Sequence, residues 1–322
     1  MHHYFQLTLE QRYQIQALSQ QPILQQDIAK QLGVSPATIS RELARNRQIG
    51  TYQAIAAQER TAQLRQRSAY KLTGSLKEDV IKGLQQRHSP EQISGLLALQ
   101  KGHQVISHEA IYQFIYKHES VDDQPLKSFL RIRHKKRYKK RGQSEQRGSI
   151  PNRVGIEERP AIVETNTEVG HWEGDTVIGA NHEGVLLTLV ERVTKYTLIV
   201  KLPSKHAHYL ATKLIACLLR CLLPVRSITF DNGREFTDHQ RISRVLKAPV
   251  FFARPYHSWE RGLNENTNGL IRQYIPKECR ISIVRPSDVN WVQDQLNHRP
   301  RKTLGFLTPI QYAQKQGIAL QT

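Results

Sequence analysis

The chain has 322 residues, which is enough for two or three domains with a sizeable core. Its 47 Lys and Arg against 28 Asp and Glu leave a net charge of +19, which indicates a polyanionic partner. No apolar run reaches the length of a membrane span, and the opening residues MHHYFQ lack the apolar core of a signal peptide, so we expect a cytoplasmic protein. The three cysteines have no metal-type pair spacing.

Residues 1–50 are predicted to form a helix-turn-helix domain. A capping-box pattern, Thr8 with Gln11, opens a helix that runs to about Ser19. A second helix is expected over about residues 24–32, and a glycine makes the turn that follows it. Ser35 then caps a third helix in the segment SPATISRELARN, with proline at its first position.

The third helix has the pattern of a helix that enters a DNA major groove. Ile39 and Leu43 are predicted to point inward with Val34, because they recur at helical spacing. The residues left on the outer face are the candidate DNA contacts: Ser35, Ala37, Ser40, Arg41 and Arg45. The alternative is a three-helix module that packs against protein. The small residues early in the helix and the arginines later favour DNA.

Two further helical segments follow. Residues 51–74 are rich in Gln, Arg and Ala and are predicted to form a helical linker. Residues 75–118 are predicted as a second helix-turn-helix, in which Ser89 opens a capping box and Ser107 caps the segment HEAIYQFIYKH. A helical spacer or a dimerisation unit is the alternative for this second segment.

Residues 119–160 are predicted to be a basic linker. Within it, the run RIRHKKRYKKRGQSEQR (131–147) holds nine Lys or Arg and one acidic residue, so it repels itself and has little to bury. A solvated surface segment is the alternative, but we interpret the run as a clamp on the DNA backbone, whose affinity would fall steeply with salt. Its candidate contacts are Arg133, Lys135, Lys136, Arg137, Lys139, Lys140 and Arg141.

Residues 161–322 have the pattern of an α/β domain. Three β-rich runs, at 171–179, 184–193 and 195–202, precede an amphipathic helix at about 205–223. A strand at Ser227 to Phe230, a helix, a short strand at Val250 to Ala253 and two more helices complete the order. This order predicts a mixed five-stranded sheet with helices on both faces, and its first and fourth strands lie near each other at the centre.

Three carboxylates stand in positions that suggest metal-dependent chemistry. Asp175 lies in a strand-like run, where a carboxylate is out of place unless something positive needs it. Asp231 ends another strand just before an Asn-Gly turn, and Glu265 lies in a helix-like segment. Phosphodiester cleavage by two divalent ions needs clustered carboxylates, and carboxylates that gather without a cation repel one another. A turn-forming role for Asp231 is the ordinary alternative.

Four other polar residues occur in the same segments as these carboxylates. Glu173 points to the same face of its strand as Asp175 and is a candidate supporting group. Glu235 is interpreted as a helix-start acid. Arg272, seven residues after Glu265, is expected on the same helix face, where it either holds DNA phosphate or forms a surface ion pair. His171 either contacts phosphate or packs.

Three blocks of the sequence, HWEGDT, TFDNGREF and the run from Glu260 to Arg272, resemble the signature blocks of DDE transposases, most closely the IS30 family of bacterial insertion sequences. Residues 232 to 264 put 33 positions between Asp231 and Glu265, which fits that family's spacing. The tail RPRKTLGFLTPIQYA at 299–313 is similar to the closing segment of such enzymes. The resemblance covers nearly the whole chain.

The resemblance implies an RNase H-like catalytic domain in which Asp175, Asp231 and Glu265 are the ligands of two Mg2+ ions, for which Mn2+ can substitute. It implies a transposase that binds the terminal inverted repeats of its element, hydrolyses the DNA at the element's ends to free 3′-hydroxyls, and joins these to target DNA. It places the protein in the bacterial cytoplasm at the nucleoid. Because two ends must be joined, a homodimer or larger assembly on DNA is expected.

Two other functions share part of this pattern. A helix-turn-helix regulator without catalysis has the same basic charge, but it has no need of three acids in these contexts. A nuclease or integrase of the RNase H-like fold keeps the acids, and only the family resemblance disfavours it.

Overall fold

The structure, a computed structural model, describes residues 6–46, 51–69, 72, 74–117, 120–121, 124–131, 150–254 and 262–318. The chain divides into two compact units, Met1–Lys77 and Glu78–Thr322. The finer boundaries predicted at residues 50, 74, 118 and 160 stay predictions.

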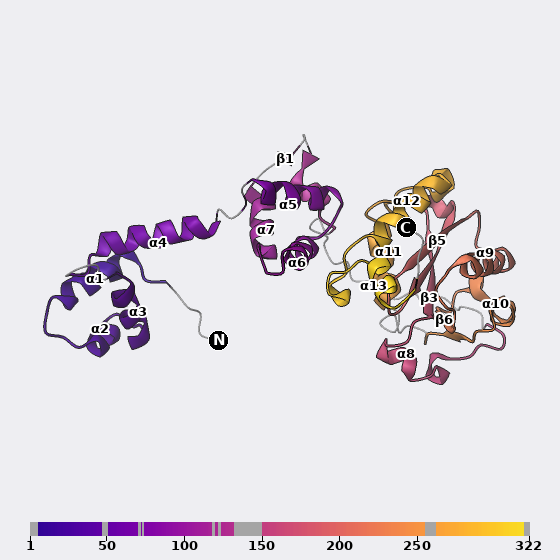
Figure 1. The fold of residues 1–322 in the computed structure, drawn as a ribbon, viewed down its shortest axis with the longest axis horizontal. Helices are drawn as coiled ribbons and strands as arrows, with labels where there is room; N and C mark the ends of the chain where they lie inside the picture. The colour runs from indigo at the N-terminus through magenta and orange to yellow at the C-terminus, as the bar shows by residue number, and fades with distance from the viewer. Residues whose placement is uncertain are drawn as a thin grey trace. The chain divides into compact units, whose positions relative to one another are not determined.

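The first unit is entirely helical where it is described (Figure 1). Thr8 and Gln11 form the predicted capping box, and the Ser35 hydroxyl accepts a hydrogen bond from the Thr38 amide at the start of the third helix. The apolar residues at helical spacing, among them Ile15, Ile28 and Ile39, form its core. Its helices are α1 (Leu9–Ser19), α2 (Gln25–Gln31), α3 (Pro36–Asn46) and α4 (Ala54–Ala69).

A buried ion pair ties these helices together. Arg12 of α1 donates from Nε to Glu42 Oε1 of α3 at 2.8 Å, and both side chains are at most 10% exposed. Glu42 also accepts from the Tyr52 hydroxyl at 3.0 Å, and Arg12 donates to Thr61 of α4. Burial, followed by the charge of Glu42, raises the pKa of Tyr52. Glu42 therefore anchors the buried face of α3, opposite the face that carries its exposed residues.

Three more helices follow, α5 (Ser75–Gln85), α6 (Pro90–Lys101) and α7 (His108–Lys117). Ser89 forms the predicted capping box with Gln92, and the Ser107 hydroxyl accepts from the Ala110 amide as the sequence suggested. After α7 come a short antiparallel pair, β1 (Ser120–Val121) with β2 (Gln124–Pro125), and a 3-10 turn, η1 (Leu126–Phe129).

Within the second unit, α6 is fastened to the C-terminal segment by Arg299, which is 2% exposed. Arg299 donates from Nε to Gln92 Oε1 at 3.0 Å and from Nη1 to Gln273 Oε1 at 2.7 Å. Its Nη2 donates to the carbonyl of Arg87. Lys302 adds an ion pair with Glu91. One buried guanidinium thus links the α5–α6 turn, the residues after α11 and the tail.

The sheet of the second unit has the strand order β5-β4-β3-β6-β7. β3 pairs antiparallel with β4 and parallel with β6, and β6 pairs parallel with β7. The predicted mixed five-stranded sheet is confirmed, with the first and fourth predicted strands adjacent. The strands are β3 (His171–Ile178), β4 (Val185–Glu191), β5 (Thr197–Leu202), β6 (Ser227–Phe230) and β7 (Val250–Phe252).

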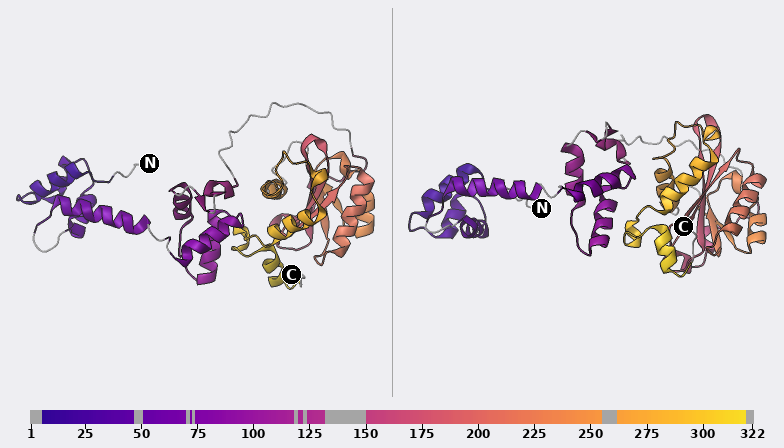
Figure 2. Two further views of the ribbon diagram at one scale, coloured as in Figure 1. Left: turned by 90° about the horizontal axis from the view of Figure 1, so that it is seen from above. Right: turned by 45° about the horizontal axis from the view of Figure 1, so that its top comes forward.

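Helices cover both faces of this sheet (Figures 1 and 2). α9 (Ala207–Arg220), α10 (His239–Leu246) and α13 (Pro309–Lys315) contribute to the core on one face. α11 (Gly262–Ile271) and α12 (Pro286–Asn297) contribute to the core on the other. β4 is buried along its whole length because its successive residues, such as Leu186 and Leu187, enter opposite cores.

Residues 150–165 lie at the edge of the sheet. The Phe252 amide of β7 donates to the carbonyl of Val154, and Ile150 joins the apolar core. A 3-10 turn, η2 (Ile156–Glu158), and a short helix, α8 (Ile162–Thr165), lead into β3. No helix in the described part of the chain is long and apolar enough to span a membrane.

Replacing Glu42 by Gln should destabilise the first unit by about 3 kcal/mol, because Arg12 would keep a buried charge without its partner. Hydrogen exchange of amides in residues 6–46 of the full chain, followed through a urea titration, measures this loss. Glu59→Gln removes an exposed acid from α4 and is the matched control. Equal stability of the two variants would contradict a structural role for the ion pair.

Candidate active site

Two of the three predicted carboxylates belong to neighbouring inner strands of the sheet, since Asp175 lies within β3 and Asp231 directly follows β6. In the parallel pair of β3 and β6, His171 lies opposite Ser227 and Glu173 opposite Thr229. Continued by two residues, this register puts Asp175 opposite Asp231. Adjacent strands are about 4.8 Å apart. The backbone therefore places these two residues on adjacent strands, and their shared role as metal ligands stays a prediction.

Asp175 is held by its own strand and by the helix on the facing side. Its Oδ1 accepts from the Thr176 amide at 2.8 Å, and its Oδ2 accepts from Asn268 Nδ2 of α11 at 2.8 Å. Asn268 also receives a hydrogen bond from Thr188 of β4. Because Asn268 lies three residues after Glu265, this contact anchors the helix that carries the third acid to the strand that carries the first.

The turn after β6 brings a further acid close to Asp231. Asp231 Oδ1 accepts from the Gly233 amide at 3.0 Å. A Cβ at position 233 would lie 2.6 Å from Glu235 Oε2 and 2.9 Å from Asp231 Oδ1. Glycine at this position therefore lets both carboxylates approach the turn.

Glu235 lies in the first turn of a 3-10 helix, η4 (Arg234–Phe236), so the predicted helix-start acid is confirmed. The sequence did not predict its further contacts: its Oε1 accepts from Thr176 Oγ1 of β3 at 2.8 Å and from Lys205 Nζ at 2.9 Å. Burial opposes its ionisation, yet the hydrogen bonds from Lys205 and Thr176 leave the pKa of Glu235 below its ordinary value. The signal available in the sequence was only its place four residues after Asp231.

Glu265 lies in the first turn of α11 and is exposed. Among the described residues no three His, Cys, Asp or Glu side chains converge as a metal site requires. The structure therefore pairs the two aspartates by strand register and leaves Glu265 outside a complete cluster. The donor set itself, three carboxylates and no sulfur or imidazole, is the set that Mg2+ or Mn2+ prefers.

Arg272 contacts the protein backbone. Its Nη2 donates to the carbonyl of Ile178 at 2.6 Å, and its Nη1 donates to the carbonyl of Pro276 at 3.2 Å. The surface ion pair with Glu265, the alternative to a phosphate contact, is not among the ion pairs of the described residues, and α11 ends at Ile271, one residue earlier. Arg272 thus joins the end of α11 to the end of β3.

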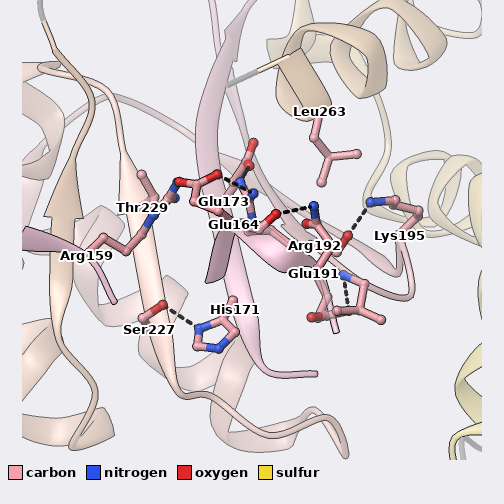
Figure 3. A network of polar contacts seen from close by, with 12 residues as sticks. Arg159, Glu164, His171, Glu173, Glu191, Arg192, Lys195, Ser227, Thr229 and Leu263 are labelled. Atoms are coloured by element: carbon pink, nitrogen blue, oxygen red, sulfur yellow. Dashed lines mark hydrogen bonds and ion pairs between the residues drawn. The ribbon is translucent and has the colours of Figure 1, made fainter. Parts of the chain in front are cut away.

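Glu173 belongs to a buried network next to the site (Figure 3). It forms an ion pair with Arg192, which also approaches Glu164 at 3.5 Å. Arg159 pairs with Glu164 and donates to Thr229 Oγ1 of β6 at 2.9 Å. The network links β3, the end of β4, β6 and α8, so Glu173 stabilises the strand that carries Asp175 through Arg192.

His171 packs inside the protein, which is the second of its two predicted roles. Its Nδ1 lies 2.8 Å from Ser227 Oγ, its Nε2 lies 2.9 Å from Glu168 Oε2, and its side chain is buried. Residues 132–149 and 255–261 are outside the described residues. The first range holds the seven predicted DNA contacts of the basic run: Arg133, Lys135, Lys136, Arg137, Lys139, Lys140 and Arg141.

The predicted DNA-contacting face of α3 is exposed. Ile39 and Leu43 are buried as expected. Arg41 donates from Nε to the carbonyl of Ala37 at 3.0 Å, and so lies along the helix surface. The exposed residues include all five candidates, Ser35, Ala37, Ser40, Arg41 and Arg45.

Comparison with known protein families matches the two regions that carry these features. A helix-turn-helix domain family matches residues 3–46, and an integrase core domain family matches residues 166–258. Together with the paired aspartates, these matches define the chain as a DDE-type polynucleotidyl transferase with a helix-turn-helix domain.

Curated relatives extend over almost the entire chain. The transposase for insertion sequence element IS4351 of Bacteroides fragilis is 42% identical over 94% of this chain and 94% of its own. The transposase for IS1086 of Cupriavidus metallidurans is 36% identical over 96% and 94%. The transposase InsI for IS30A of Escherichia coli is 36% identical over 98% and 84%. The chain belongs to the IS30 family of insertion-sequence transposases.

Replacing Glu235 by Ala should lower the rate of DNA-end cleavage by about 10-fold or more, because Thr176 beside Asp175 would lose its acceptor. Affinity for end DNA should stay within about twofold of wild type. Glu183→Ala, which removes an exposed acid near Ser282, is the control. Cleavage unchanged in both variants would show that Glu235 does not position the site.

Proposed function

We propose that this transposase binds the terminal inverted repeats of its own element and hydrolyses the DNA at the element's ends to free 3′-hydroxyls. Those hydroxyls then attack phosphodiesters of target DNA. The observation that supports the proposal most directly is the register of β3 with β6, which, continued by two residues, has Asp175 opposite Asp231; Asp175 also contacts α11 through Asn268. A DNA-binding regulator would have no use for this pair.

The proposed ligands of two Mg2+ ions are Asp175, Asp231 and Glu265, and Mn2+ is expected to substitute. Two ions bound there would activate the attacking water or hydroxyl and stabilise the departing oxygen. Glu265 completes the set when its exposed side chain turns toward the aspartates, and the Asn268 contact keeps its helix against β3.

The residues around the pair hold it in place. Thr176 and Asn268 donate to the two oxygens of Asp175, while the Gly233 amide donates to Asp231. These donors fix the carboxylates before substrate arrives, which reduces the reorganisation that catalysis requires. Glu235 supports the same strand through Thr176.

DNA recognition is assigned to two parts of the chain. The exposed face of α3, led by Arg41 and Arg45, is proposed to read base edges in the major groove, since it is helical, outward-facing and basic. The basic run between 131 and 147 is proposed to bind phosphates without reading sequence. Nη1 and Nη2 of Arg272 each donate to a backbone carbonyl. Its proposed phosphate contact therefore uses only the remaining N–H groups of the guanidinium.

Joining two ends requires two active sites to act together, so we propose a homodimer or larger assembly on DNA. Its place of action is the bacterial nucleoid in the cytoplasm, where the element's DNA lies.

The triad is tested with purified protein, duplex DNA of the element's ends and Mg2+, run beside Asp175→Asn, Asp231→Asn and Glu265→Gln. We expect wild type to give cleaved and joined products, and each variant to give neither while binding end DNA within about threefold of wild type. Removing Mg2+ with a chelator should abolish both products, and Mn2+ should restore them.

Other outcomes would assign a different function. Tight binding of end DNA by wild type, with neither cleavage nor joining, would favour a regulator. Cleavage without joining would favour a nuclease. A variant with unchanged cleavage would remove that residue from the proposed triad.

Arg41→Ala should weaken binding to end DNA by about 1–3 kcal/mol and leave binding to unrelated DNA nearly unchanged, if Arg41 contacts a base edge. Titrations of labelled end duplex and scrambled duplex at one salt concentration measure the difference. Arg285→Ala removes an exposed arginine paired with Asp288 in the other unit and controls for net charge. An equal loss on both duplexes would make Arg41 a phosphate contact.

A further inference from the structure

Four arginines of the second unit gather where the α5–α6 turn, α11 and the tail meet. Arg299 donates to the carbonyl of Arg87, and both side chains donate to Gln273. Arg301 follows two residues after Arg299. Burial, and the neighbouring charges of Arg131 and Arg87 among others, lower the pKa of Arg299 to about 10. Arg131 is therefore close enough to act electrostatically on this group.

None of the four forms an ion pair with a carboxylate within the described residues. Arg299 and Arg87 donate to amide and carbonyl oxygens. Arg301 donates to the carbonyl of Leu296, and its buried Nε has no partner in the described structure. Arg301 is 8% exposed. Arg299 and Arg301 are the buried members, and buried positive charges without counter-charges are costly, so this cluster is suited to an anion.

Arg131 is the exposed member of the cluster and lies against the helix that carries Glu265. Its Nη1 donates to Asn266 Oδ1 at 2.7 Å, and its Nη2 approaches the Asn266 carbonyl at 3.3 Å. A side chain at position 269 would collide with Arg131 Nη2, so Gly269 makes the space that the guanidinium occupies. Arg131 is also the first residue of the basic run.

We infer that Arg131 forms, with the buried arginines behind it, a binding site for one internucleotide phosphate of the DNA substrate beside Glu265. This inference rests on the proposed function, because it takes the DNA end as the anion. A guanidinium binds two phosphate oxygens at once, and its hydrogen bonds to a charged phosphate are stronger than those to the neutral oxygens of Asn266. Arg87, Arg299 and Arg301 keep the local potential positive.

Because the phosphate site at Arg131 lies beside Glu265, it can set the position of the DNA in the active site. Asn266, which Arg131 contacts, adjoins Glu265 on α11. A phosphate held by Arg131 would therefore lie beside Glu265. Arg131 is thus a positioning residue for the DNA, distinct from the three proposed metal ligands.

Full-length wild type, Arg131→Gln, Arg131→Lys and the control Arg285→Gln are compared for affinity to end duplex across a range of salt concentrations. One lost phosphate contact should reduce the slope of log K against log salt by about 0.9 in Arg131→Gln and leave Arg285→Gln unchanged. Arg131→Lys should keep the slope and lose part of the affinity, since ammonium cannot bind two oxygens in a fork.

A second measurement replaces each phosphate of the end duplex in turn by a neutral methylphosphonate. At one position the replacement should weaken binding by wild type and have no further effect on Arg131→Gln. Identical slopes for Arg131→Gln and Arg285→Gln, or the same methylphosphonate profile in wild type and Arg131→Gln, would overturn the inference. Far-UV circular dichroism and thermal melting confirm that the exposed substitution leaves the fold intact. Both readouts are binding measurements, so a wild type that binds but does not cleave would refute the proposed function and still test Arg131.

Discussion

The parallel pairing of β3 with β6 is the constraint on which the rest of the site depends. Continued by two residues, it sets Asp175 opposite Asp231 on the inner strands of the sheet. Donors reach these carboxylates from three directions: the Thr176 amide on the strand itself, Asn268 on α11 and the Gly233 amide in the turn. The same pairing thus sets both the spacing of the two aspartates and the groups that orient them.

Helix α11 connects the strand of Asp175 to the C-terminal segment and the α5–α6 turn. Asn268 fastens it to β3, and Arg272 fastens its end to the carbonyl of Ile178. Gln273, just after it, receives hydrogen bonds from Arg87 and Arg299, which also hold α6. A shift of the α5–α7 helices on the tail would therefore act directly on the helix that carries Glu265. Helices α5–α7 are therefore held to the same unit as the sheet and α11.

Local patterns predicted the elements well, while long-range polar contacts escaped them. Capping residues such as Thr8 and Ser89 mark helix starts because the interaction spans only three residues. The order of strands predicted that the strands of Asp175 and Asp231 are adjacent, as the pairing of β3 with β6 confirms. The contacts of Glu235 were missed because its partners, Thr176 and Lys205, are 59 and 30 residues away. The contacts of Arg272 with the carbonyls of Ile178 and Pro276 could likewise not be read from the helix pattern.

The buried pair of Arg12 and Glu42 separates two tasks within α3. Its inner face is fixed by an ion pair, a tyrosine hydroxyl and apolar residues, whereas Ala37, Ser40 and Arg41 on its outer face carry no part of the core. Substitutions at these outer positions would thus leave the buried contacts of the helix bundle intact, so the stability of the first unit and its proposed sequence preference can vary independently.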